Sequence, residues 1–129
     1  MSIKPTDAEL EILNILWEKG GCSVRTVHDI LTEQKDVFYT TTLKTMQVMT
    51  DKGLLDRDTS HRSHIYFAKV MKNEIQESLL GKVVDSVFGG STAKLILSAI
   101  GHQQPSKAEL AEIKSILDKL ENQENDGLD

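Results

Sequence analysis

Cysteine is nearly absent from this chain, since Cys22 is the only one among 129 residues. A lone cysteine cannot close an internal disulfide or build a multi-cysteine metal site. A reducing, cytoplasmic compartment is therefore expected. No histidine or basic cluster stands next to Cys22 in the sequence, so we expect a small buried side chain rather than a reactive thiol.

Long apolar runs are missing as well. Residues 1–5 lack the apolar core of a signal peptide, and no segment approaches the roughly 20 apolar residues that span a membrane. No membrane insertion is expected. The sequence also lacks a glycine-rich phosphate loop, a nucleophile elbow and a zinc-protease motif. We therefore expect no cofactor and no enzymatic activity.

The histidines do not form a metal-binding pattern. His61 and His64 are separated by two residues in a polar segment, but no third ligand stands near them. His28 and His102 are isolated. We predict no metal site, and we interpret His61 and His64 as exposed side chains.

The charge of the chain is unevenly distributed. The net charge of −5 argues against a nucleic-acid partner, but residues 71–129 hold most of the acidic excess. Residues 39–69 are locally basic, because Lys44, Lys52, Arg57, Arg62 and Lys69 outnumber Asp51, Asp56 and Asp58. Such an asymmetry can suit one DNA-facing surface. An excess this small is also common on an ordinary solvated face.

Hydrophobic spacing and caps predict three helices before residue 53. Thr6-x-x-Glu9 is a capping box that starts the first helix, and Gly20-Gly21 ends it. Ser23 can cap the second helix, and Gly53 stops the third. The apolar residues at helical spacing on the first two helices are Leu10, Ile12, Leu13, Ile15, Leu16, Trp17, Val24, Val27, Ile30 and Leu31.

A hairpin is predicted after the third helix. Residues 54–58 and 64–68 have the composition of strands, and polar residues 59–63 connect them. Three helices followed by a hairpin is the order of a winged helix-turn-helix, a mainly α fold with a small β-hairpin, whose third helix enters the major groove. The DNA-binding domain is predicted to cover residues 1–70.

The third helix has two different faces. Leu43, Met46 and Met49, with Thr42 and Thr50, are predicted to face the core. The opposite face carries hydroxyl and cationic side chains that can bond phosphates and base edges. A threonine-rich solvated face is the alternative, and the adjacent basic hairpin favours DNA. The candidate DNA-binding residues are Thr40, Thr41, Lys44, Thr45, Val48, Lys52, Arg57, His61 and Arg62.

The rest of the chain is predicted to be helical. Gly89-Gly90 and Pro105 separate the helices, and Ser106-x-x-Glu109 is a second capping box. These helices are too apolar to be buried within one small chain, so we expect a homodimer formed by residues 71–122, followed by a flexible acidic tail at 123–129. A monomer whose helices fold back is the alternative. The candidate dimerisation residues are Ile75, Leu79, Val83, Val87, Leu95, Ile96, Ile100, Leu110, Ile113, Leu117 and Leu120.

Several segments together resemble one family. "YTTTLKTMQVMTDKGLLDRD" and "IYFAKV" resemble the recognition helix and hairpin of the BlaI/MecI/CopY family of bacterial penicillinase-type transcriptional repressors, in which the pattern runs close to Y-T-T-V-L-x-x-L-x-R-L-x-x-K-G-L. "TDAELEILNILWEKG" is similar to the family's first helix, and "SKAELAEIKSILDKL" to its last helix. The resemblance covers nearly the whole chain.

The resemblance implies a homodimeric repressor of resistance or metal-homeostasis genes, which is inactivated through a membrane sensor protease or by metal. Val48 stands where the family often has arginine, and an apolar contact to a thymine methyl is the expected substitute. The cleaved Asn-Phe bond of β-lactam-responsive relatives corresponds to Ser98-Ala99, which makes these two residues the candidate cleavage site. The paired C-x-C motifs of copper-sensing relatives are missing, so copper sensing is excluded.

Two other functions stay open at this point. A winged-helix domain can serve protein contacts alone, with the acidic C-terminal helices as its docking surface and without specific DNA binding. A ligand-sensing regulator would need a pocket in the helical part, which the sequence does not indicate. Binding that centres on a palindrome and weakens steeply with salt would favour the repressor.

Overall fold

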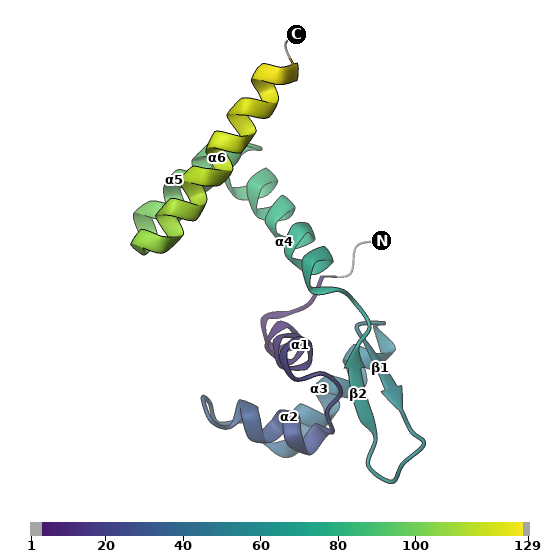
Figure 1. Cartoon of the computed structure of the whole chain (residues 1–129). Coiled ribbons are helices and arrows are strands. Elements are labelled where there is room, and N and C mark those ends of the chain that lie inside the picture. The colour runs from purple at the N-terminus through teal and green to yellow at the C-terminus, as the bar shows by residue number, and fades with distance from the viewer. Residues whose placement is uncertain (1–3, 128–129) are drawn as a thin grey trace. The chain divides into compact units, whose positions relative to one another are not determined.

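The helices and strands follow the predicted order of a winged helix. The computed structural model describes residues 4–127 of the chain (Figure 1). Its elements are α1 (Asp7–Lys19), α2 (Val24–Leu31), α3 (Tyr39–Asp51), β1 (Leu55–Asp58), β2 (Ile65–Ala68), α4 (Lys72–Val87), α5 (Thr92–His102) and α6 (Lys107–Gly127). Three helices followed by an antiparallel hairpin confirm the predicted mainly α class.

The chain divides into two compact units, one ending at Lys82 and one beginning at Val83. The hairpin ends at Ala68, just before the predicted boundary at residue 70. The structure assigns the first part of α4 to the N-terminal unit, where Ile75 is only 5% exposed. The segment predicted to be a flexible tail, 123–129, is helical as far as Gly127, where α6 ends. Residues 128–129 lie outside the described range.

The predicted caps set the boundaries of the first two helices. Thr6 Oγ1 accepts the amide of Glu9 at 3.2 Å, and Glu9 Oε1 accepts the amide of Thr6 at 2.8 Å, so both halves of the capping box form. Ser23 Oγ accepts the amide of Thr26 at 3.2 Å at the start of α2. Gly20 ends α1 with φ of 81°, a left-handed conformation that favours glycine.

One hydrophobic core joins the first three helices to the hairpin, which lies alongside α1 and α3 in Figure 1. The predicted inner face of α3 is confirmed, because Thr42, Met46 and Met49 are at most 1% exposed. The other buried members of the core are Ile12, Leu13, Leu16, Cys22, Val24, Val27, Leu31, Leu54, Leu55 and Tyr66.

The hairpin is attached to the helices at two places. β1 and β2 pair antiparallel along their whole length. Cys22 forms a further bridge to β2, in which its amide donates to the Tyr66 carbonyl at 3.0 Å and the Tyr66 amide donates to the Cys22 carbonyl at 2.8 Å. Trp17 Nε1 donates to the carbonyl of Val70 at 3.0 Å, just after β2. The base of the hairpin therefore has a fixed position relative to α1.

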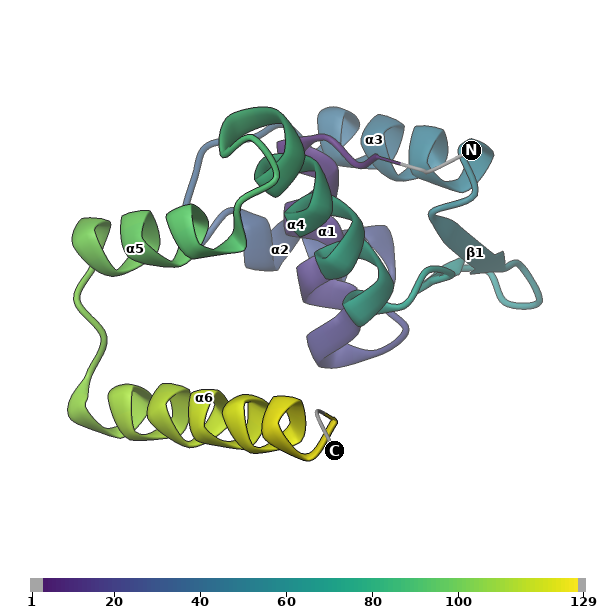
Figure 2. The ribbon, with the colours of Figure 1, turned by 90° about the horizontal axis from the view of Figure 1, so that it is seen from above.

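The second unit consists of the end of α4, α5 and α6. Figure 2 shows that α5 and α6, which are joined by a short connection, run in opposite directions. Ser106 Oγ accepts the amide of Glu109 at 3.1 Å, and Glu109 Oε1 accepts the amide of Ser106 at 3.2 Å, which confirms the second capping box. Within residues 4–127, no single helix is long and apolar enough to cross a membrane, and only α4 and α5 taken as a bent pair meet that requirement.

Candidate nucleic-acid interface

The outer face of α3 is an accessible and largely polar surface. Thr40, Thr41 and Lys44 are exposed, and Val48 is 40% exposed. Thr45 is partly buried, and its hydroxyl donates to the carbonyl of Thr41 at 2.8 Å, so only its methyl and its lone pairs are available to a ligand. Because the core contacts of α3 lie on its other side, this face can approach a groove without disturbing the fold.

The start of α3 is held against α2 by polar and aromatic contacts. Thr42 Oγ1 lies 3.0 Å from His28 Nδ1, and both side chains are buried. The ring of His28 meets the ring of Tyr39 edge-on, with 5.4 Å between centroids and an interplanar angle of 88°. The guanidinium of Arg25 lies over the Tyr39 ring, 4.5 Å from its centroid. This series of contacts runs from the core to the surface.

Lys52 was predicted to face DNA, and its ammonium group is bound within the chain. Lys52 Nζ donates to both carboxylate oxygens of Glu9, at 2.8 and 2.9 Å. Burial is the largest influence on Glu9 and raises its pKa, but hydrogen bonds from Lys52 and Thr6 together outweigh burial and hold the pKa below its ordinary value. Lys52 therefore joins the end of α3 to the start of α1, and a contact with DNA stays a prediction.

The hairpin carries the other predicted DNA-binding residues. Arg57, His61 and Arg62 are all exposed. Asp58 accepts both the hydroxyl and the amide of Ser60, at 2.6 and 2.9 Å, and these bonds lower the pKa of the Asp58 carboxyl. The turn that carries His61 and Arg62 therefore begins with a defined bend.

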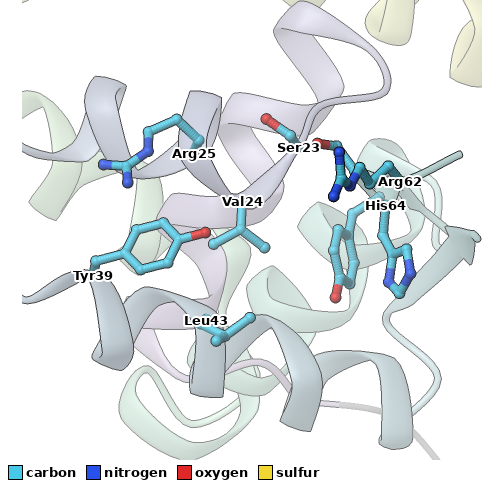
Figure 3. A pocket seen from close by; sticks show the side chains of 9 residues that line it. Ser23, Val24, Arg25, Tyr39, Leu43, Arg62 and His64 are labelled. Atoms are coloured by element: carbon cyan, nitrogen blue, oxygen red, sulfur yellow. The ribbon is translucent and has the colours of Figure 1, made fainter.

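A hollow of about 280 Å³ lies where α2, α3 and the hairpin meet (Figure 3). Arg25 enters it from α2, Tyr39 and Leu43 from α3, and Arg62 and His64 from the hairpin. The hollow thus brings together a predicted residue, Arg62, and an unpredicted one, Arg25. Sequence reasoning missed Arg25 because it stands outside the basic segment, although a cation in the first turn of the second helix was visible in the sequence.

The cysteine and the histidines have structural surroundings. Cys22 is buried as predicted, and burial raises the pKa of its thiol although Lys19 lies near enough to oppose the shift. His28 contacts Thr42 and Tyr39 inside the helix-turn-helix. Within residues 4–127, no three histidine, cysteine or carboxylate side chains are grouped in a way that could hold a metal ion.

The family model described as penicillinase repressor matches residues 5–119 of this chain. The chain belongs to the penicillinase repressor family. The resemblance found in the sequence is thereby confirmed. As a member of this family, the protein is a DNA-binding transcriptional repressor and not an enzyme.

Relatives of this penicillinase repressor match it over most of their length. The methicillin resistance regulatory protein MecI of Staphylococcus aureus (strain N315) is 25% identical over 114 residues, which cover 88% of this chain and 93% of MecI. MecI of Mammaliicoccus sciuri gives the same figures. The solution structure of Bacillus licheniformis BlaI, in its monomeric form in complex with the blaP half-operator, matches with a TM-score of 0.50 and 19% identity, covering 56% of this chain and 88% of that one. This likeness confirms the winged-helix fold.

The second unit of this penicillinase repressor exposes most of the predicted dimerisation residues. Two of the candidates, Ile75 and Leu79, belong to the N-terminal unit, and Ile75 is buried there. Ser98 and Ala99, at the candidate cleavage site, are exposed on α5. The exposed dimerisation candidates are Val83, Val87, Ile96, Ile100, Leu110, Leu117 and Leu120, and the partly buried ones are Leu79, Leu95 and Ile113.

Proposed function

We propose that the protein is a cytoplasmic homodimeric repressor that binds a palindromic operator sequence-specifically, with α3 in the major groove and the hairpin on the backbone or in the minor groove. The observation that carries this proposal is the division of α3 into two faces. Thr42, Met46 and Met49 are buried, whereas Thr41 and Lys44 on the other side are exposed. A recognition helix needs this arrangement, because one face must anchor it while the other meets base edges.

The chemistry of the exposed face suits base contacts. The Lys44 ammonium can donate to guanine O6 and N7, and threonine can bond to several bases. Val48 offers only methyl groups, which can contact the methyl group of thymine. Arg57 and Arg62 are cations on the neighbouring hairpin, where they can neutralise phosphates and set the position of α3 in the groove. Family membership supports DNA as the partner.

The exposed apolar residues of the second unit support the dimer. Val87 is 68% exposed and Leu97 is 71% exposed, and further apolar side chains lie exposed along α6. Apolar surface of this extent favours association with a second copy, and a twofold pair presents two recognition helices to two half-sites. BlaI of Bacillus licheniformis forms its complex with a half-operator as a monomer. By analogy, each protomer here would occupy one half-site.

Selection of bound duplexes from a random pool tests this function. We expect a palindrome with half-sites centred about one helical turn, or a multiple of it, apart. Lys44→Ala should weaken binding to the selected operator by about 1–3 kcal/mol and relax base preference at one position in each half-site. Arg62→Ala should weaken binding to all duplexes alike and lower the salt dependence.

Lys35→Ala is the matched control for these two variants. It removes the same charge from an ammonium that Glu11 already engages at 3.1 Å, so its effect on operator binding should be small. If Lys44→Ala and Arg62→Ala both bound the operator as tightly as the unmodified chain, the proposed surface would be wrong. If the chain instead bound a protein without salt dependence and shifted no duplex, it would be the protein-interaction module.

A further inference from the structure

Arg25 lies outside the segment that composition and spacing marked as DNA-facing, yet it lines the same hollow as Arg62. Figure 3 shows Arg25 and Tyr39 facing each other from α2 and α3, with Arg62 and His64 coming from the hairpin. Of the described residues that line this hollow, none carries a carboxylate. Cations therefore gather here without an acidic counterpart in the wall.

The Arg25 guanidinium is oriented before any ligand arrives. It lies over the Tyr39 ring, 4.5 Å from the centroid, an arrangement that attracts a cation to the π face of the ring. Tyr39 is itself held by the edge-on ring of His28, and His28 Nδ1 lies 3.0 Å from the buried Thr42 hydroxyl. A guanidinium held over a ring still has N–H groups available to a ligand, and its planar set of donors matches two oxygens of a phosphate.

The hollow also has hydroxyl groups suited to an anion. Ser23 and Ser63 line it, and Ser23 stands at the start of α2, where the positive end of the helix dipole lies. Val24 and Leu43 add apolar wall between the two arginines. The chemistry is that of a site for one anionic oxygen cluster, and on a DNA-binding surface the available anion is a backbone phosphodiester.

We infer that the hollow between α2, α3 and the hairpin binds one backbone phosphate of each DNA half-site, with Arg25 as the contacting residue and Tyr39 as the residue that positions it. The inference rests on the proposed function, because it assigns a further contact to the same DNA surface. It places α2, together with α3 and the hairpin, on the duplex. It also gives Tyr39 a role that differs from base recognition.

The test measures how binding depends on salt, with the selected operator and an unrelated duplex of equal length as probes. Each phosphate neutralised adds about 0.9 to the slope of log affinity against log salt concentration. Arg25→Ala should therefore lower the magnitude of the slope by about 0.9 for each bound protomer, on both duplexes. Between 50 and 200 mM salt, the affinity of this variant should then fall by roughly three- to fourfold less per protomer than that of the unmodified chain. Arg25→Lys should keep the slope, because it keeps the charge.

Tyr39 variants separate positioning from charge. Tyr39→Leu removes the ring and should weaken binding by about two- to fivefold, the fold-change expected for an exposed cation–π contact. Tyr39→Phe keeps the ring and should bind as the unmodified chain does. In an Arg25→Ala background, Tyr39→Leu should have no further effect, since the cation that it positions is gone. An equal loss in both backgrounds would overturn the positioning role.

A single uncharged methylphosphonate, moved along the operator, locates the contact. At one position in each half-site, the methylphosphonate should weaken binding by the unmodified chain but should not weaken binding by Arg25→Ala. If Arg25→Ala changed neither the salt slope nor the methylphosphonate profile, this inference would be overturned. The proposed function would still stand, provided that the unmodified chain binds the operator. Failure of the unmodified chain to bind any duplex would overturn both. Lys35→Ala, whose ammonium is engaged by Glu11, serves as the equal-charge control.

Discussion

The ion pair between Glu9 and Lys52 should contribute measurably to the stability of the winged helix. The side chain of Glu9 is only 5% exposed, whereas the side chain of Lys52 is 38% exposed. Glu9→Gln is the most conservative perturbation, because the amide oxygen can still accept the backbone N–H of Thr6. What is lost is the negative charge that receives both hydrogen bonds from Lys52.

The expected magnitude follows from the exposure of the two partners. A hydrogen bond to a charged group contributes about 1.5–3 kcal/mol, and the partly solvated Lys52 places this contact at the lower end. Glu9→Gln should therefore lower the unfolding free energy by about 1.5 kcal/mol. In a domain of this size, that corresponds to a drop of about 6–12 °C in the thermal midpoint. Lys52→Met should cost more, about 3 kcal/mol, because it leaves a buried carboxylate without its cation.

The pH dependence gives this prediction a sharper test. Because the folded state lowers the pKa of Glu9 from 4.5, the contribution of the ion pair is fully present above that pH and is lost as the pH falls through the folded pKa. The difference in stability between the unmodified chain and Glu9→Gln should be constant from about pH 7 to 5 and shrink in more acidic solution. Urea unfolding followed by circular dichroism at each pH measures it.

Two results would refute this reasoning about Glu9. One is a Glu9→Gln variant as stable as the unmodified chain at pH 7. The other is a difference that stays unchanged as the pH falls well below 4.5, since protonation of the Glu9 carboxylate should remove the contribution of the ion pair. Operator binding by Lys52→Met, measured at several salt concentrations, tests separately whether Lys52 contacts a phosphate. An unchanged slope would assign Lys52 to the fold alone, and a slope lower by about 0.9 per protomer would add a phosphate contact.

Three further changes test the packing and the assembly. Thr42→Val should lower stability by about 1–3 kcal/mol, because it leaves His28 Nδ1 without its buried partner, and Thr42→Ser should restore the thermal midpoint. Gly21→Ala should cost about 1 kcal/mol, since its Cβ would overlap the half-exposed ring of Phe67 and also crowd Ile65 Cγ2, and a Phe67→Ala background should reduce that loss in urea unfolding without removing it. Leu117→Asp should give monomers in sedimentation velocity, and an unchanged dimer would exclude Leu117 from the interface.

The local features of the fold could be predicted from the sequence because they depend on residues close together in the chain. Thr6 and Glu9 are three residues apart, and a capping box needs nothing beyond that spacing. Likewise, the period of the apolar residues in α3 was enough to separate Met46 and Met49 from Lys44. The order of helices and hairpin, and with it the winged helix, followed from such short-range signals.

The partners of the charged side chains were decided only by the tertiary structure. Glu9 and Lys52 are separated by 43 positions in the sequence, and nothing in the spacing of the chain indicates that they meet. Arg25 and Tyr39 come from two helices whose crossing is set by core packing, so the cation on the ring could not be foreseen. The sequence determined which side chains face outward along each helix. Where those side chains meet depends on how the helices and the hairpin pack, because long-range contacts are set by the shape of the shared core.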